Sequence, residues 1–277
     1  KTEEKVPKYK KGKHFPKEWI QDIKYSQSGN FLAVGSHDNN IYMYRRKPLR
    51  EQTFEIYKQG RYELYCVCAK HNSFITHLDF SKIEGSGSMV CKKAQPKDTS
   101  MTLDTNDLTA GFGEDGQWYH EGDESRYLMS TCGAYELLFW DLSVSSLHKG
   151  SRPYKAKQVT RVSTLKDISW YTFTMPLGWN VQGIWPPAAD GTDINAISRS
   201  NNERLCVTAD DFGRVKLFRW PCISNKAQSK NYRGHASHVT NITFSHDDGY
   251  VISTGGTDNC IFLWKTDYDH NEQMKLE

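Results

Sequence analysis

The stretch "GHASHVTNITFSHDDGYVISTGGTDNCIFLWK", residues 234–265, contains short apolar runs separated by turn residues. One run ends at Phe244, and the last closes on Trp264 after a turn rich in Gly, Thr and Asp. This pattern predicts short β-strands joined by hairpins. His235 and Asp258 raise the question of whether the stretch performs chemistry or is one unit of a repeated scaffold.

The same order of runs and turns recurs upstream. The four repeats lie near 14–47, 62–142, 168–221 and 232–265, and they close on Tyr44, Trp140, Phe218 and Trp264. These aromatic residues are 96, 78 and 46 residues apart, and only the last interval is near the roughly 40–45 residues of a WD40 blade. The longer intervals therefore contain insertions, of which 82–125 is the largest.

The repeat predicts an all-β fold, a WD40-type β-propeller of which about four blades are seen. A four-stranded blade cannot bury both faces alone, and stacking blades around an axis covers those faces. The sequence shows no long helical pattern. We expect an open arc, or an arc completed by residues outside this chain, with 1–13 as a basic connector and 266–277 as a C-terminal tail.

The fourth repeat carries polar residues that suit an internal hydrogen-bond network. A buried imidazole and a buried indole N–H both need partners. A chain from Asp258 through His235 and Thr254 to Trp264 supplies them and predicts a structural pin.

The other repeats keep only parts of this network. The second retains His71, Ser130 and Trp140 but has Ala134 at the turn position, so it lacks the acid. We therefore expect the network to be complete once, with packing holding the other blades.

Several segments resemble the echinoderm microtubule-associated protein-like family. The most specific are "ADDFGRVKLFRWPC", residues 209–222, and "WNVQGIWPPAADGTDINAI", residues 179–197; "NFLAVGSHDNNIYMY" and "SFITHLDFS" are similar to earlier blades. The resemblance covers most of 14–265. It implies part of a tandem pair of propellers that binds tubulin or microtubules, without catalysis, on the cytoskeleton of the cytoplasm and of the ciliary axoneme.

Composition excludes several classes of protein. The 277 residues carry a net charge of +3, from 36 basic and 33 acidic residues, which is too mild to indicate nucleic-acid binding. No apolar stretch approaches the roughly 20 residues that cross a bilayer, so we expect no membrane partner. The seven cysteines include no C-x-x-C pair and are interpreted as reduced, buried thiols.

The candidate catalytic motifs have simpler explanations. "GFGEDG", residues 111–116, matches a dinucleotide-binding pattern, but its acidic residues repel phosphate and no helix follows. His235 with Asp258 resembles an acid–base pair but has no nucleophile beside it. We therefore predict no enzyme, no cofactor and no metal.

Two segments are candidates for partner binding. The first contains basic residues that could contact an acidic surface such as tubulin, or could belong to a solvated connector: Lys8, Lys10, Lys11 and Lys13. The second is the insertion 82–125, in which Trp118 and Tyr119 could anchor a partner, pack back on the blade or lie in a disordered loop.

Two functions follow. The first is microtubule association by a non-enzymatic protein, which rests on the family resemblance and extends to other cytoskeletal or axonemal partners. The alternative is a general WD40 scaffold that gathers signalling or ciliary proteins through the inserted loop, because propellers host many functions.

Overall fold

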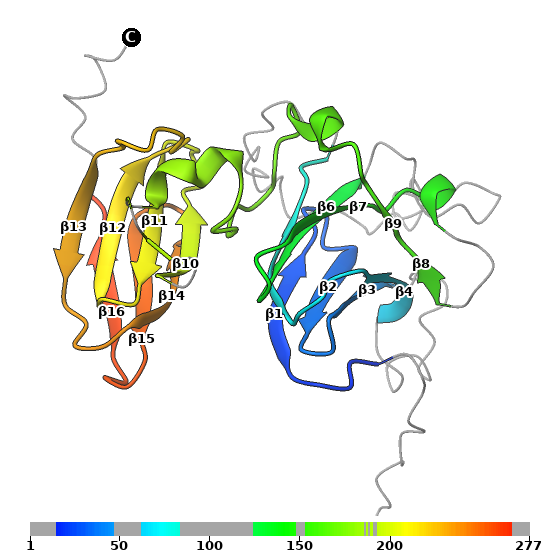
Figure 1. The fold of residues 1–277 in the computed structure, drawn as a ribbon, viewed down its shortest axis with the longest axis horizontal. Coiled ribbons are helices and arrows are strands. Elements are labelled where there is room, and N and C mark those ends of the chain that lie inside the picture. Colours follow the sequence, from blue (N-terminus) through cyan, green and yellow to red (C-terminus); the bar gives the residue numbers. More distant parts are fainter. Residues whose placement is uncertain are drawn as a thin grey trace, which may run out of the picture.

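Four β-sheets make up the part of the chain that the computed structural model describes, which is residues 15–46, 62–83, 124–147, 153–185, 187, 189–190 and 193–267. Each sheet is built from strands that follow one another in sequence, with short edge strands added later (Figure 1). The only helical elements in these ranges are the 3₁₀ turns η3 (Val144–Ser146), η4 (Val162–Leu165) and η5 (Trp179–Ile184). The predicted all-β class is confirmed.

The first two sheets share the N-terminal half of the described chain. Sheet one has the order β1-β2-β3-β4-β8, formed by Ile20–Tyr25, Phe31–Ser36, Asn40–Arg46, Tyr62–Ala69 and Tyr154–Lys155. Sheet two has the order β5-β6-β7-β9, formed by Ile75–Phe80, Tyr127–Cys132, Leu137–Asp141 and Lys157–Gln158.

The other two sheets follow. Sheet three has the order β10-β11-β12-β13, formed by Ile194–Arg199, Leu205–Asp210, Arg214–Arg219 and Ser229–Arg233. Sheet four has the order β14-β15-β16, formed by Val239–Phe244, Tyr250–Gly255 and Ile261–Lys265. Figure 1 shows sheets one and two on one side and sheets three and four on the other, joined by the segment that carries η4 and η5.

Polar side chains shape the hairpin turns. In the β2–β3 turn, Asn39 adopts a left-handed backbone with φ 67°, and Asp38 Oδ1 accepts the Asn40 N–H at 3.2 Å. In the β11–β12 turn, Gly213 has φ 72°, and Asp210 Oδ1 accepts two backbone N–H groups of the turn. Asp and Asn suit such turns because their side chains bond to nearby backbone and tolerate positive φ.

The sheets are offset by one strand from the sequence repeats. Strand β4 falls in the repeat near 62–142 but pairs with β3, so it completes sheet one. Strand β13 likewise completes sheet three, beside β12. A strand shared in this way ties each repeat to its neighbour.

The polar segment after β7 links two sheets. Strand β8 runs parallel to β4, and strand β9, two residues later, pairs antiparallel with β7. The sequence pattern predicts no strand here, because these strands are only two residues long and lie at sheet edges.

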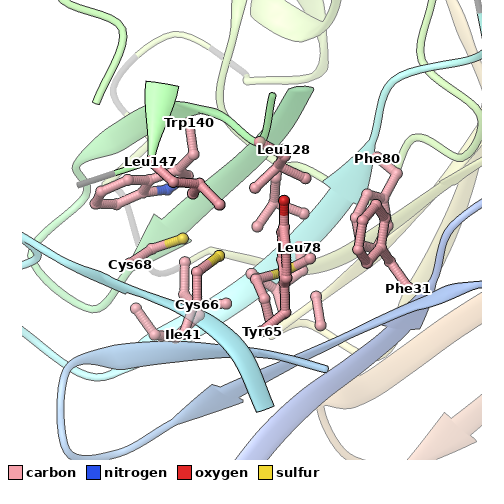
Figure 2. Packing of buried hydrophobic residues seen from close by; sticks show 14 residues of the cluster. Phe31, Ile41, Tyr65, Cys66, Cys68, Leu78, Phe80, Leu128, Trp140 and Leu147 are labelled. Carbon is pink, nitrogen blue, oxygen red and sulfur yellow. The ribbon is translucent and has the colours of Figure 1, made fainter. Parts of the chain in front are cut away.

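Apolar side chains from sheets one and two form the first core cluster. Figure 2 shows Ile41 and Cys66 facing Leu128 and Trp140, with Phe31 beside Phe80, all of them buried. Burial of a large apolar side chain stabilises the folded state by about 1.5–3 kcal/mol, so this cluster holds the two sheets together.

A polar bridge joins sheets two and three. Asp79, fully buried on β5, accepts hydrogen bonds from the Thr172 hydroxyl and from the Thr174 backbone N–H, the latter at 2.7 Å. Arg199 on β10 donates to the Trp170 and Tyr171 carbonyls at 2.9 and 3.0 Å. The segment around residues 170–174 is thus bound from both sides, and its Trp170 and Phe173 belong to a second apolar cluster that includes residues of both sheets.

Apolar side chains also remain exposed on the two terminal sheets. Ile23 and Tyr25 on β1 are about half exposed, and Ile261 and Leu263 on β16 are 73% and 64% exposed. Strands of this kind normally bury such residues against a neighbouring blade. No helix in the described ranges combines the length and apolar character needed to span a membrane.

Candidate functional site

A hydrogen-bond network around His235 holds together the end of sheet four that carries the β15–β16 hairpin. His235 Nδ1 lies 2.9 Å from Asp258 Oδ2, and Nε2 lies 2.8 Å from Ser253 Oγ. The Trp264 indole N–H donates to the same Ser253 oxygen at 2.9 Å. The loop before β14 and strands β15 and β16 therefore meet at one hydroxyl group, and the turn joins them through the contact of Asp258 with His235.

The repeat pattern predicts Thr254 as the source of that hydroxyl, and this prediction is wrong. Thr254 Oγ1 instead lies 2.9 Å from the Thr240 hydroxyl on the other side of the sheet. Successive side chains of a strand point to opposite faces, so a shift of one residue moves the hydroxyl out of the network. Ser253 is fully buried on the side where His235 lies.

Sheet two contains a second network with the predicted residues. His71 Nε2 lies 2.7 Å from Ser130 Oγ, and the Trp140 indole N–H donates to that oxygen at 2.8 Å. The acid comes from Glu136, whose Oε2 is 3.4 Å from His71 Nδ1, a distance within ion-pair range but without hydrogen-bond geometry. The expectation that this repeat lacks an acid is therefore wrong.

Hairpin length explains why the acid moves. Ser253 pairs with Phe262, nine residues later, whereas Ser130 pairs with Leu138, eight residues later. In the shorter hairpin, the position six residues before the tryptophan is Ala134, which has no carboxylate, whereas in sheet four it is Asp258. The acid of sheet two is Glu136, two positions further on, whose longer side chain reaches His71. Counting back from the closing tryptophan does not find the serine either, because Ser130 lies 10 residues before Trp140 whereas Ser253 lies 11 residues before Trp264.

Hydrogen bonds set the ionisation of both acids. The pKa of Glu136 is lowered to about 2, first by the Asn72 backbone N–H and then by the Cys132 thiol and the Asn72 side chain. Burial opposes ionisation of Asp258, but hydrogen bonds from His235 and from two backbone N–H groups outweigh it and lower the pKa. Desolvation lowers the pKa of His71, which favours its neutral form.

Sheets one and three keep only remnants of the network. The Tyr42 hydroxyl donates to Asp38 at 2.7 Å in sheet one. In sheet three, Lys216 forms a 2.9 Å ion pair with Asp210, and the buried Thr208 hydroxyl makes no hydrogen bond within the described part of the chain. Phe218 replaces the tryptophan here, and apolar packing around it stabilises this sheet.

The network residues are enclosed rather than presented to a substrate. The His71 and His235 side chains have no exposed surface, and the nearest hydroxyls, Ser130 and Ser253, are fully buried. A general base must reach a proton of its substrate. The geometry therefore supports a structural role.

The predicted partner-binding residues lie outside the described residues: Lys8, Lys10, Lys11, Lys13, Trp118 and Tyr119. Both ends of the insertion 82–125 are nevertheless anchored on the β1–β2 turn. The Ile83 N–H donates to the Gln27 side chain at 3.0 Å, and the Ser28 hydroxyl donates to Glu124. The insertion thus leaves and re-enters the fold at one fixed place.

The cysteines are free thiols wherever they are described. Five are buried, namely Cys66, Cys68, Cys132, Cys206 and Cys222. Cys260 is exposed, contrary to the expectation of buried thiols, because it lies in the β15–β16 hairpin at the rim of sheet four. Cys91 lies outside the described residues.

Comparison with known proteins matches this sequence to one family. Residues 118–266 match the model of the echinoderm microtubule-associated protein second beta-propeller, and residues 7–45 match the WD domain, G-beta repeat. The chain is 38% identical over 249 residues to human echinoderm microtubule-associated protein-like 4, covering 90% of this chain and 19% of that protein.

Other relatives agree. Mouse echinoderm microtubule-associated protein-like 1 is 37% identical over 249 residues, covering 90% of this chain and 23% of that protein, and the mouse protein-like 3 is 36% identical over 248 residues, covering 90% and 21%. The chain spans about a fifth of the length of the curated relatives it matches. With its sheets, its His–Ser–Trp networks and these matches, the chain belongs to the echinoderm microtubule-associated protein-like family and folds as WD40 β-propeller blades.

Proposed function

We propose that this chain is a non-enzymatic part of a microtubule-associated protein and that its blades contact tubulin. The observation that carries the proposal is the match along 90% of the chain to relatives named as microtubule-associated protein-like. The enclosed histidine networks support it, because they leave the residues that resemble a catalytic site engaged in internal hydrogen bonds.

Exposed aromatic side chains favour one end of the blades as the contact surface. The hairpins between the second and third strands of sheets two and three present Tyr135 and Phe212, which are 51% and 68% exposed. In sheet one, Trp19 is 78% exposed and lies against His37 of the equivalent hairpin, with ring centroids 5.8 Å apart. Aromatic residues often dominate the binding energy of protein interfaces.

The test is co-sedimentation of the intact protein with taxol-stabilised microtubules across a salt series. We expect pelleting at low salt, and its absence there would refute the proposed function. Phe212→Ser should weaken pelleting if the hairpin ends form the surface. The matched control is Tyr250→Ser, an exposed aromatic at the opposite strand ends, which should pellet as the unaltered protein does.

The basic segment is tested separately. Replacing Lys8, Lys10, Lys11 and Lys13 by Ala should reduce pelleting mainly at low salt if these residues contact tubulin, because attraction between exposed charges is screened by salt. Unchanged pelleting at every salt concentration would assign them to a solvated connector.

A scaffold function is the second candidate, and the anchored insertion favours it. Because Ile83 and Glu124 hold both ends of the insertion to sheet one, the loop body can be removed without disturbing the blades. Deleting residues 86–121 should abolish capture of a signalling or ciliary partner while microtubule pelleting persists. Loss of pelleting in the same deletion would instead assign tubulin contact to the loop.

A further inference from the structure

Three potential metal ligands converge at the rim of sheet two. His71 lies in the loop before β5, Cys132 ends β6, and Glu136 immediately precedes β7. Cys132 Sγ is 3.3 Å and His71 Nδ1 is 3.4 Å from Glu136 Oε2, and the ligand atoms of all three lie within 4.8 Å of one another.

The His71 ring carries a nitrogen without a hydrogen-bond partner. Its side chain has no exposed surface, and Nε2 is occupied by Ser130, but Nδ1 makes no hydrogen bond to any residue that the structure describes. In sheet four the equivalent Nδ1 of His235 lies 2.9 Å from Asp258, with hydrogen-bond geometry. Sheet two therefore leaves a buried ring nitrogen aimed at a thiol and a carboxylate, and an unsatisfied buried group of this kind needs an explanation.

We propose that His71, Cys132 and Glu136 bind a Zn²⁺ ion. An imidazole nitrogen, a thiolate and a carboxylate are the ligands that zinc takes in proteins. Zinc–ligand bonds of about 2.0–2.3 Å in a tetrahedron place neighbouring ligand atoms about 3.3–3.6 Å apart. The separations of 3.3 and 3.4 Å at Glu136 Oε2 fit this spacing.

Neighbouring residues orient two of the ligands. The Asn72 backbone N–H donates to Glu136 Oε2 at 3.0 Å, and the Asn72 amide donates to Oε1. Ser130 engages Nε2 of His71, which turns Nδ1 toward the site. Such second partners commonly fix the direction of metal ligands. Binding replaces the thiol proton of Cys132, which is released to solvent, by a bond from the thiolate to zinc.

Zinc at this position would tie the loop before β5 to the β6–β7 hairpin. The Glu136 side chain is 27% exposed, so solvent reaches this ligand and water or a side chain of a partner could complete the coordination. The ion would do in sheet two what the His235–Asp258 hydrogen bond does in sheet four.

Zinc binding to the purified full chain tests the proposal. After treatment with a chelator, the protein is dialysed against Zn²⁺, and the bound metal is measured by mass spectrometry. A parallel sample receives Co²⁺, whose bond to a thiolate gives a charge-transfer band in the ultraviolet. We expect one zinc ion per chain and a cobalt–thiolate band. Cys132→Ser should abolish the band and weaken zinc binding by about tenfold or more, since even the loss of a residue that only orients a ligand costs about 10–100-fold.

The matched control is Cys260→Ser, which removes a thiol from the equivalent hairpin of sheet four, next to Asp258. This variant should keep both the zinc and the band. Glu136→Gln, which retains the thiol, should also weaken zinc binding. The proposal would be overturned if the unaltered chain lacked either stoichiometric zinc or the cobalt band, a result that does not depend on the folding of any variant. It would also be overturned if Cys132→Ser bound zinc as tightly as the unaltered chain.

Discussion

Replacing Ser253 by Ala removes the hydroxyl that joins His235 to Trp264. Its oxygen lies 2.8 and 2.9 Å from their ring nitrogens. The change creates almost no cavity, so its cost comes from the two groups left without a partner, at about 1–3 kcal/mol for each when buried. The His235 side chain is fully enclosed, whereas Trp264 is partly exposed and can find water, so we expect a loss of about 2–4 kcal/mol.

Urea unfolding followed by circular dichroism measures this loss as a lower midpoint. Thr254→Ala is the matched control, because Thr254 bonds only to the exposed Thr240 and its loss should cost under about 1 kcal/mol. Ser130→Ala should cost more than Ser253→Ala, because Trp140 is fully buried. If Thr254→Ala lowered the midpoint as much as Ser253→Ala, the assignment of the hydroxyl to Ser253 would be refuted.

Three further changes test the contacts between sheets. Asp79→Ala should destabilise the chain by about 1–3 kcal/mol and speed hydrogen exchange around residue 174, because it removes the carboxyl oxygen that accepts that backbone N–H. Unchanged exchange there would contradict the bridge. Gly35→Ala should lower the free energy of unfolding by about 1–3 kcal/mol, since its Cβ would lie 2.6 Å from Ile75 Cγ2. Ile75→Ala should cost less in the Gly35→Ala chain than in the unaltered chain, because it removes the clash. Strictly additive losses in urea unfolding would count against the contact. Burial lowers the pKa of His77 to about 4, below its unfolded value, so the folded state binds fewer protons than the unfolded state. The free energy of unfolding should therefore fall as pH drops from about 6.5 toward 4. His77→Gln should flatten that part of the pH–stability curve, and an unchanged slope would argue against this role of His77.

Local patterns in the sequence predicted the strands and the family. Apolar runs bounded by Gly, Asp and Asn led to the hairpins, because strand period and turn chemistry are properties of neighbouring residues. The same patterns did not predict the edge strands β8 and β9. They are two residues long and exist only because β4 and β7 offer free edges.

The networks show the limit of sequence reasoning at the level of single residues. His235, Asp258 and Trp264 were identifiable because a buried imidazole and indole need partners. Choosing between the adjacent Ser253 and Thr254 required the strand register, which depends on the number of residues in the hairpin.

What the sequence by itself determined is the β-propeller fold, the repeat and the family, since all three follow from residues close together in the chain. Only the tertiary structure decided which side chains meet across the sheets: Glu136 in place of an aspartate beside His71, Cys132 next to both, and Asp79 bridging to the segment before sheet three. These contacts join residues that are up to 95 positions apart. Their distances depend on register, on hairpin length and on the packing of one sheet against the next, and none of these is a property of a single stretch of sequence.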